Sequence, residues 1–328
     1  MNLICMDTNE RSQPKTLRKF QAEFSDCWRR LPNKAFFFAL LAVWLMLFQF
    51  LGNATFGYIN TPSLFRWMFN AYNSRVISDD DAQGNLIPFL VIGLFWWKRK
   101  ELLELPLKIW LPALGFVVLG LALHVIGFII QQPRVSTVAL FIGIYGLMGL
   151  AWGRAWLRNS LFPFFLFIFS VPLGIVLEPI TFPLRLLVCQ LVEVVSHWIL
   201  GIDVTRIGTQ LIDPSGTYQY DVQAACSGIR SLVAIFLLAT AYGFMMFRSP
   251  WKRLFLMVLA FPLSVLGNLV RMLCIIVAAE IGGQSAGDYV HEGGPLGIIS
   301  LLPYIPAIFG LLLVGRWLEK KFVEKPQA

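Results

Sequence analysis

The chain has 328 residues, of which 57% are hydrophobic and 14% charged, and its formal net charge is +8. A soluble domain carries about 25% charged residues, so this composition excludes an ordinary soluble protein. The apolar runs repeatedly reach the roughly 20 residues that a helix needs to cross a bilayer, which predicts an all-α polytopic membrane protein; a β-barrel would show short alternating segments instead. The positive charge does not indicate nucleic-acid binding, because the basic residues cluster between the apolar runs.

The first 34 residues are polar and basic, which predicts a cytoplasmic tail. This stretch is too long and too charged for the n-region of a signal peptide, and no small-residue cleavage site follows the first apolar run. The chain from residue 35 is therefore expected to remain in the membrane as an anchor. Nine apolar runs follow, at about 35–56, 86–97, 109–131, 135–152, 161–179, 182–201, 224–247, 254–279 and 296–315.

The charges between these runs predict the topology. The basic N-terminal tail, the basic residues 98–100 and the basic C-terminus are expected inside, and the acidic residues 79–81 outside. The topologies deduced from the N-terminus and from the C-terminus agree only if segment 182–201 does not cross the membrane. Its mixture of polar and apolar residues favours a helix in the outer interface. The sequence therefore predicts about eight transmembrane helices, one outer interfacial helix and two cytoplasmic termini.

The segment that precedes the seventh run has a different pattern. Residues 202–223 alternate between polar and apolar and contain a Pro-Ser-Gly turn, which predicts a short β-hairpin outside the membrane. This hairpin leads the chain directly into Cys226.

Cys226 is the candidate nucleophile. It lies at the predicted start of a helix, where unpaired amides and the helix dipole favour a thiolate. Ser227 and Gly228 follow, and small residues at these positions let another backbone approach the thiol. The remaining cysteines lie in the tail or in apolar surroundings and are expected to be structural or incidental: Cys5, Cys27, Cys189 and Cys274. None forms a CxxC pair, so neither a metal site nor a disulfide framework is expected.

Arg271 interrupts an apolar run, and an arginine inside a membrane helix indicates a functional site unless it extends to the interface. At an active site its guanidinium would lower the thiol pKa and hold the oxyanion of a tetrahedral intermediate. Asn268 lies one turn earlier and is a candidate to orient Arg271 or a substrate. Arg230 lies one turn after Cys226, on the same helix face.

His291 lies in a glycine-rich loop on the same predicted face as Cys226. It could take the thiol proton and later protonate a leaving amine. Glu292 and Asp288 are candidates to orient its ring. His124 lacks such neighbours, whereas His197 lies on the predicted interfacial helix and remains open as a further candidate.

Three motifs occur in order: AACSGIRSL around Cys226, GNLVR ending in Arg271, and a loop histidine, His291, before the last run. Together with GIDVTRIGTQLI before the cysteine, they resemble the exosortase/archaeosortase family over roughly residues 160–315. Archaeal relatives have arginine at the third position, so His291 resembles the bacterial branch. The expected parts of the chain are a basic tail 1–34, membrane spans 35–159, an exosortase-like catalytic region 160–315 and a basic tail 316–328.

The resemblance implies a membrane-embedded cysteine transpeptidase with Cys226, Arg271 and His291 as its catalytic residues and no metal or cofactor. Its partners would be exported proteins with a C-terminal sorting signal, consisting of a short motif such as Pro-Glu-Pro, a transmembrane helix and a basic cluster. It would cleave at the motif through a thioester and transfer the protein to an unidentified surface acceptor, a polysaccharide or a lipid. The enzyme would lie in the bacterial cytoplasmic membrane with its site on the extracytoplasmic side.

Two other readings of the same residues remain open. An intramembrane cysteine protease that only hydrolyses its substrate would use the same groups. A transporter would place Arg271 and Arg230 in an anion pathway, although no self-similarity between the chain halves indicates inverted repeats. A metal or haem enzyme is disfavoured because the three histidines lack paired spacing.

Overall fold

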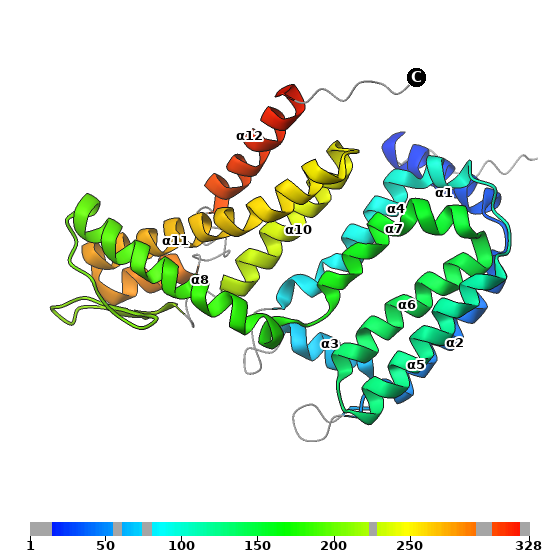
Figure 1. Ribbon diagram of the computed structural model, residues 1–328, viewed down its shortest axis with the longest axis horizontal. Coiled ribbons are helices and arrows are strands. Elements are labelled where there is room, and N and C mark those ends of the chain that lie inside the picture. Colours follow the sequence, from blue (N-terminus) through cyan, green and yellow to red (C-terminus); the bar gives the residue numbers. More distant parts are fainter. Residues whose placement is uncertain (1–14, 55–60, 74–80, 223–227, 293–303, 322–328) are drawn as a thin grey trace, which may run out of the picture. The chain divides into compact units, whose positions relative to one another are not determined.

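The computed structural model describes residues 15–54, 61–73, 81–222, 228–292 and 304–321 (Figure 1). The chain forms two compact units. The first comprises Met1–Trp67 and Pro88–Ile168, and the second comprises Met68–Ile87 and Phe169–Ala328. Each of the nine predicted apolar runs contains a helix, so the protein is predominantly helical, as its sequence predicts.

The first unit contains helices and connecting loops and no strand over its described residues. Its α-helices are α1 (Lys15–Arg30), α2 (Lys34–Leu51), α4 (Ile87–Leu103), α5 (Leu114–Ile129), α6 (Pro133–Trp152) and α7 (Arg154–Phe165), with short 3-10 turns η3 (Leu111–Ala113) and η4 (Leu166–Ser170). Helix α6 is its central element. The Trp44 indole of α2 donates to the carbonyl of Leu140 at 3.0 Å, and a Cβ at Gly143 would lie 2.0 Å from the Trp44 ring. Glycine at 143 therefore allows α2 to approach α6.

The second unit combines helices with a small sheet. Its helices are α8 (Gly174–Val195), the π-helical turn η5 (Ser196–Leu200), α10 (Gly228–Met246), α11 (Pro250–Glu292) and α12 (Ile305–Lys321), with the 3-10 turn η2 (Ala82–Asn85). Helix α3 (Leu64–Asn73) begins in the first unit and ends in the second.

The structure corrects the predicted elements at three places. The sequence predicted a break between 179 and 182, but α8 continues through Pro179 and Pro183 and the chain bends before Gly174 instead. Membrane helices tolerate proline because neighbouring groups can satisfy the freed carbonyls. Helices α1 and α3 lie where a tail and a loop were predicted. Helix α1 is largely polar and α3 has only ten residues, so neither stands out as a membrane span, and tertiary contacts stabilise them, such as the Tyr72 hydroxyl of α3 bonding to the carbonyl of Ser170.

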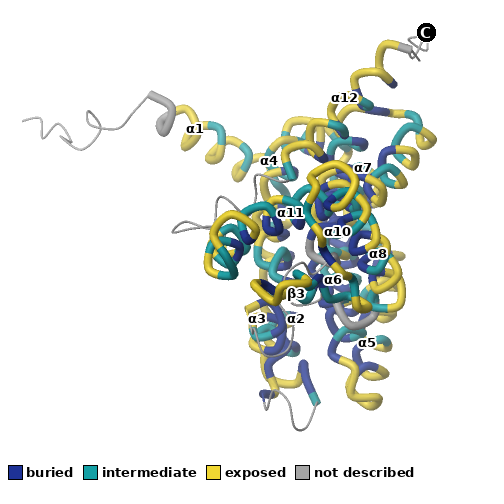
Figure 2. Tube along the Cα trace, turned by 90° about the vertical axis from the view of Figure 1, so that its left-hand side faces the viewer, coloured by how far each residue is buried: buried dark blue, intermediate teal, exposed yellow. Residues whose placement is uncertain are grey.

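The outer faces of the helices are apolar, which fits a lipid environment. Figure 2 shows exposed stretches along α12, where Phe309 is 59% and Leu313 49% exposed. Five described helices are long and apolar enough to cross a membrane: Lys34–Leu51, Leu111–Ile129, Pro133–Trp152, Leu177–Leu200 and Pro250–Glu292. The predicted total of eight spans and the interfacial position of 182–201 stay predictions, since Leu177–Leu200 has the length and composition of a crossing helix.

The segment predicted as a β-hairpin contains three strands. Strands β1 (Thr205–Ile207), β2 (Gln210–Ile212) and β3 (Gln219–Asp221) form an antiparallel sheet in the order β1-β2-β3. Leu211 lies opposite Arg206 on one side and Tyr220 on the other. Buried side chains join this sheet to α8 and α11 in one apolar core: Val188, Cys189, Val192, Val204, Leu211, Tyr218, Tyr220, Val222, Met272, Ile275, Ile276 and Ala279.

Helix α11 reverses near its end. Gly282 and Gly283 leave the helical conformation, and Gly283 has a φ of 72° and a ψ of −172°, a combination that only glycine adopts without strain. The Tyr220 hydroxyl donates to the carbonyl of Gln284 at 3.1 Å, and the backbone N–H of Gln219 donates to the Gln284 side-chain oxygen at 2.9 Å. Strand β3 is therefore bound to the turn that follows the reversal.

Glycine at 287 is required for this contact, because a Cβ at this position would lie 1.9 Å from the Tyr220 oxygen. We expect Gly287→Ala to separate β3 from the end of α11 and to lower the free energy of unfolding by about 1–3 kcal/mol, the usual cost of overpacking. Thermal unfolding of the purified protein in detergent measures the change.

Gly243→Ala is the matched control. Its Cβ would meet its nearest neighbour at 3.5 Å, an ordinary contact, and alanine favours the helix interior. The control should leave stability unchanged or raise it; an equal loss in both variants would contradict the role of Gly287.

Candidate active site

Arg271 lies on α11 close to the start of α12. Its Nη1 donates to the Tyr304 hydroxyl oxygen and its Nη2 to the backbone carbonyl of His291, both at 3.3 Å. The reversal at Gly282 and Gly283 makes the second bond possible, because it returns residue 291 to the level of Arg271. The structure thus brings two predicted site residues together, through the backbone of His291.

A second polar cluster joins α10 to α11. The Asn268 side-chain amide donates to the Ser231 hydroxyl oxygen at 2.8 Å, and the hydroxyls of Ser231 and Ser264 lie 3.3 Å apart. All three residues are at most 5% exposed. Asn268 therefore binds the first turn of α10, whereas the sequence suggested that it orients Arg271 or a substrate. This cluster places the start of α10 beside residues 264–268 of α11.

Several predicted site residues fall where the structure gives no side-chain description. Cys226 and Ser227 lie outside the described residues. Gly228 is the first residue of α10, and Arg230 lies in its first turn, with its side chain undescribed. In the sequence Cys226 stands two residues before α10 and four after Val222, which is 1% exposed.

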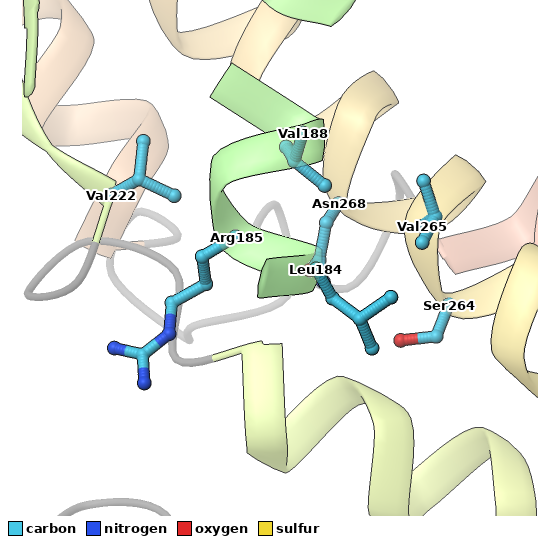
Figure 3. A pocket seen from close by; sticks show the side chains of 7 residues that line it. All are labelled: Leu184, Arg185, Val188, Val222, Ser264, Val265 and Asn268. Carbon is cyan, nitrogen blue, oxygen red and sulfur yellow. The ribbon is translucent and has the colours of Figure 1, made fainter. Parts of the chain in front are cut away.

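Val222 also borders a small cavity of about 10 Å³ between α8 and α11 (Figure 3). A cavity of this size lies at the lower limit for holding one water molecule. The Oδ1 atom of Asn268, on the cavity wall, is buried and has no hydrogen-bond partner among the described residues. Ser264 and Arg185 also line the cavity, and in Figure 3 the Arg185 side chain extends from α8 away from Asn268 and Ser264.

Arg185 is a buried charge that the sequence reading did not select. It is 4% exposed, and its Nη2 donates to a Glu178 carboxylate oxygen at 2.6 Å. The two residues lie seven positions apart, on one face of α8. The rule that selected Arg271, an arginine inside an apolar helix, could also have found Arg185.

His291 and its predicted orienting neighbours lie at the end of α11. The His291 side chain is half-buried and Glu292 is exposed at the last position of α11. Asp288 accepts from the Gln284 side-chain amide at 2.9 Å. The roles of Glu292 and Asp288 in orienting the His291 ring stay predictions.

The other two histidines have partners of their own. His124, in the first unit, lies 3.2 Å from the Ser136 hydroxyl. His197 pairs with Asp203 at 2.8 Å on an exposed surface. Among the described residues, no group of three His, Cys, Asp or Glu side chains could hold a metal ion.

The two tyrosines that bind the sheet to α11, Tyr218 and Tyr220, have raised pKa values and ionise only at high pH. Burial, followed by the nearby Asp288 carboxylate, raises the pKa of Tyr220 to about 12. Burial and then Glu280 raise the pKa of Tyr218 above its ordinary value; the Tyr218 hydroxyl donates to a Glu280 oxygen at 3.3 Å. Both hydroxyls therefore remain protonated, and the contact stays intact, over the neutral pH range.

These features define a helical membrane protein with apolar outer faces and a cluster of polar groups buried among α10, α11 and the start of α12. A family model described as transmembrane exosortase matches residues 72–314, more than half of the chain. The chain therefore belongs to the transmembrane exosortase family. The match confirms the resemblance found in residues 160–315 and extends it toward the N-terminus. Comparisons with curated proteins and with solved structures find no match.

The pKa of Tyr220 can be tested by following tyrosinate absorbance with pH. The folded pKa of about 12 lies above the unfolded value of about 10, so its stabilising contribution is complete below pH 10 and is lost as the pH rises through 12. Tyr220→Phe should remove one tyrosine that ionises near pH 12. If the tyrosine missing from the titration of this variant is instead one that ionises near pH 10, the buried, hydrogen-bonded position of Tyr220 is contradicted.

Tyr304→Phe tests whether Arg271 is held as described. Loss of an acceptor for a charged donor costs about 1.5–3 kcal/mol, against about 1 kcal/mol for a neutral hydrogen bond. The control is Tyr145→Phe, which removes a hydroxyl that donates to the carbonyl of Leu157 at 2.8 Å. Thermal unfolding should show the larger loss for Tyr304→Phe; equal losses would mean that the Arg271–Tyr304 bond contributes little.

Proposed function

We propose that this protein is a membrane-embedded cysteine transpeptidase that cleaves the C-terminal sorting signal of exported proteins and passes them to a surface acceptor. Cys226 is the nucleophile, Arg271 stabilises the oxyanion and His291 transfers the proton. Family membership supports the class of reaction. The residue roles rest on the three motifs and on the chemistry of their side chains.

One observation carries the proposal: the Arg271 guanidinium lies 3.3 Å from the backbone carbonyl of His291. Two of the three proposed catalytic residues, twenty positions apart in the chain, thus meet at one point of the bundle. The Asn268–Ser231 bond supports placing the third nearby, because it holds the first turn of α10 against α11 only a few residues after Cys226.

The depth of Arg271 agrees with a site near the outer membrane surface. Twenty-one residues separate it from Pro250, which corresponds to roughly 30 Å of helix. That length equals the thickness of the hydrocarbon core. The turn between α10 and α11 and the first turn of α11 contain three basic residues: Arg248, Lys252 and Arg253. If this basic turn is cytoplasmic, as charge topology predicts, Arg271 lies near the opposite surface.

In the first step, His291 takes the thiol proton of Cys226, and the thiolate attacks the carbonyl carbon of the scissile peptide bond. A C–S bond forms and the carbonyl oxygen becomes an oxyanion, which the Arg271 guanidinium stabilises. A guanidinium has five N–H donors, so one anchored on Tyr304 and the residue 291 carbonyl can still donate to this oxygen. The C–N bond then breaks, and His291 protonates the leaving amine.

In the second step, an amine or hydroxyl of the acceptor attacks the thioester carbon. His291 takes the acceptor proton, a new bond to the acceptor forms, and the C–S bond breaks to release Cys226. Water in place of the acceptor would give simple hydrolysis. Ser227 and Gly228 leave space beside the thiol, Arg230 is positioned to meet an acidic residue of the substrate motif, and Glu292 is a candidate to orient His291.

Co-expression with a reporter tests this function. The reporter carries a short motif, a transmembrane helix and a basic cluster at its C-terminus, and mass spectrometry determines its new C-terminus. The unmutated enzyme should remove the tail and leave added acceptor mass. Cys226→Ala should abolish processing, and Arg271→Gln should slow it about 100- to 1,000-fold, the usual effect of removing an oxyanion donor.

Cys274→Ala is the matched control, because Cys274 is an exposed thiol on α11 with no proposed role. It should process the reporter like the unmutated enzyme. A bare new carboxylate would indicate hydrolysis instead of transfer. Processing by Cys226→Ala would overturn the nucleophile assignment and revive the transporter reading of Arg271.

A further inference from the structure

The first unit contains a cavity of about 420 Å³ that the proposed reaction does not use. Helices α1, α2, α4, α6 and α7 contribute to its wall, and more than half of the lining residues are aromatic. Its volume lies within the roughly 300–1,000 Å³ typical of small-molecule sites. An apolar wall of this kind selects an apolar occupant, because water would find few hydrogen-bond partners there.

One residue of this wall has a buried polar atom that lacks a partner in the described part of the chain. Trp156 is 6% exposed, and its indole N–H is buried without a hydrogen-bond acceptor among the described residues. The indole of Trp152, also on the wall, donates to the carbonyl of Pro32 at 2.9 Å. A buried donor without an acceptor is unfavourable, so an occupant with an acceptor oxygen at Trp156 would be favoured.

Arg99 is the one charged residue among the described residues that line the cavity. Its guanidinium lies 4.2 Å from the centre of the Trp96 ring, its Nη1 donates to the carbonyl of Trp96 at 2.8 Å, and it pairs with Glu23. Basic residues outnumber acidic ones six to two in residues 15–34 and four to two in residues 98–108. This end of the cavity therefore favours an anionic group.

Helix α1 has the features of a helix at the membrane interface. Phe20, Phe24 and Trp28 recur every four residues on one face and are 42–50% exposed, while Arg29 and Arg30 end the helix. Phe24 and Trp28 also line the cavity. The cavity is thus bordered by the side chains that would enter the lipid headgroup layer.

We infer that this cavity binds one acyl chain of an anionic glycerophospholipid from the cytoplasmic leaflet. The chain lies among the aromatic side chains, an ester carbonyl accepts from the Trp156 N–H, and the phosphate lies beside the basic ends of α1 and α4. Trp156 lies between Arg154 and Arg158 in the sequence, and these basic residues place it level with the same surface.

Photolabelling of the full-length protein in detergent tests the inference. The probe is phosphatidylglycerol with a diazirine in one acyl chain, and mass spectrometry locates the labelled peptides. Label should concentrate on α1, α4 and residues 148–156. Unlabelled phosphatidylglycerol should compete for it, whereas phosphatidylcholine should compete at least about fivefold more weakly.

Three variants address separate parts of the site. Leu103→Trp should fill the cavity and remove most of the label. Trp156→Phe keeps the shape but removes the donor, and should weaken labelling about three- to tenfold. Arg99→Gln should abolish the preference for the anionic lipid, while its control, Arg316→Gln, which changes an exposed arginine of α12 in the second unit, should retain it.

Alkylation of the unmutated protein gives a test that does not depend on any variant folding. The Cys27 thiol lines the cavity, whereas Cys274 is exposed on α11. Phosphatidylglycerol should slow the reaction of N-ethylmaleimide with Cys27 at least about fivefold and leave Cys274 unchanged. Unprotected Cys27 with label spread over other helices, or protection by a second protein chain cross-linked at α1, would overturn the lipid assignment.

Discussion

The docking of strand β3 on the reversed end of α11 is the constraint on which the candidate active site depends. Gly283 permits the reversal, Gly287 lets the Tyr220 ring approach, and Gln284 accepts hydrogen bonds from Tyr220 and from the backbone of Gln219. The strand that leads toward Cys226 is thereby bound to the turn that carries His291. This contact supports the reversal at Gly282 and Gly283 that returns residue 291 to Arg271.

The cost of burying polar groups in an apolar bundle explains why the remaining contacts are so specific. Arg271 binds Tyr304 and the residue 291 carbonyl, Asn268 binds Ser231, and Arg185 binds Glu178. Each bond offsets a desolvation penalty that would otherwise oppose folding. The same bonds orient groups for chemistry, so stability and the proposed catalysis use one set of contacts within the second unit.

The two units suggest different uses of one membrane protein. The second unit contains the described members of the candidate site, and the family match over residues 72–314 covers most of this unit and part of the first. The first unit contains an aromatic cavity with one buried, unsatisfied indole N–H and a basic border. Lipid binding there and acyl transfer in the second unit are separate proposals, and each can fail without the other.

The sequence alone determined the membrane class, the positions of most of the apolar helices and the family, because apolar run length, charge between runs and short motifs are local properties. It did not show that α8 continues from run 161–179 into run 182–201. The sequence also selected Arg271, since an arginine is costly inside any apolar helix. Only the tertiary structure decided that Arg271 meets Tyr304 and the residue 291 backbone, that Asn268 binds Ser231, and that α1 and α3 are helical. These depend on packing between segments far apart in the chain, which helical periodicity does not encode.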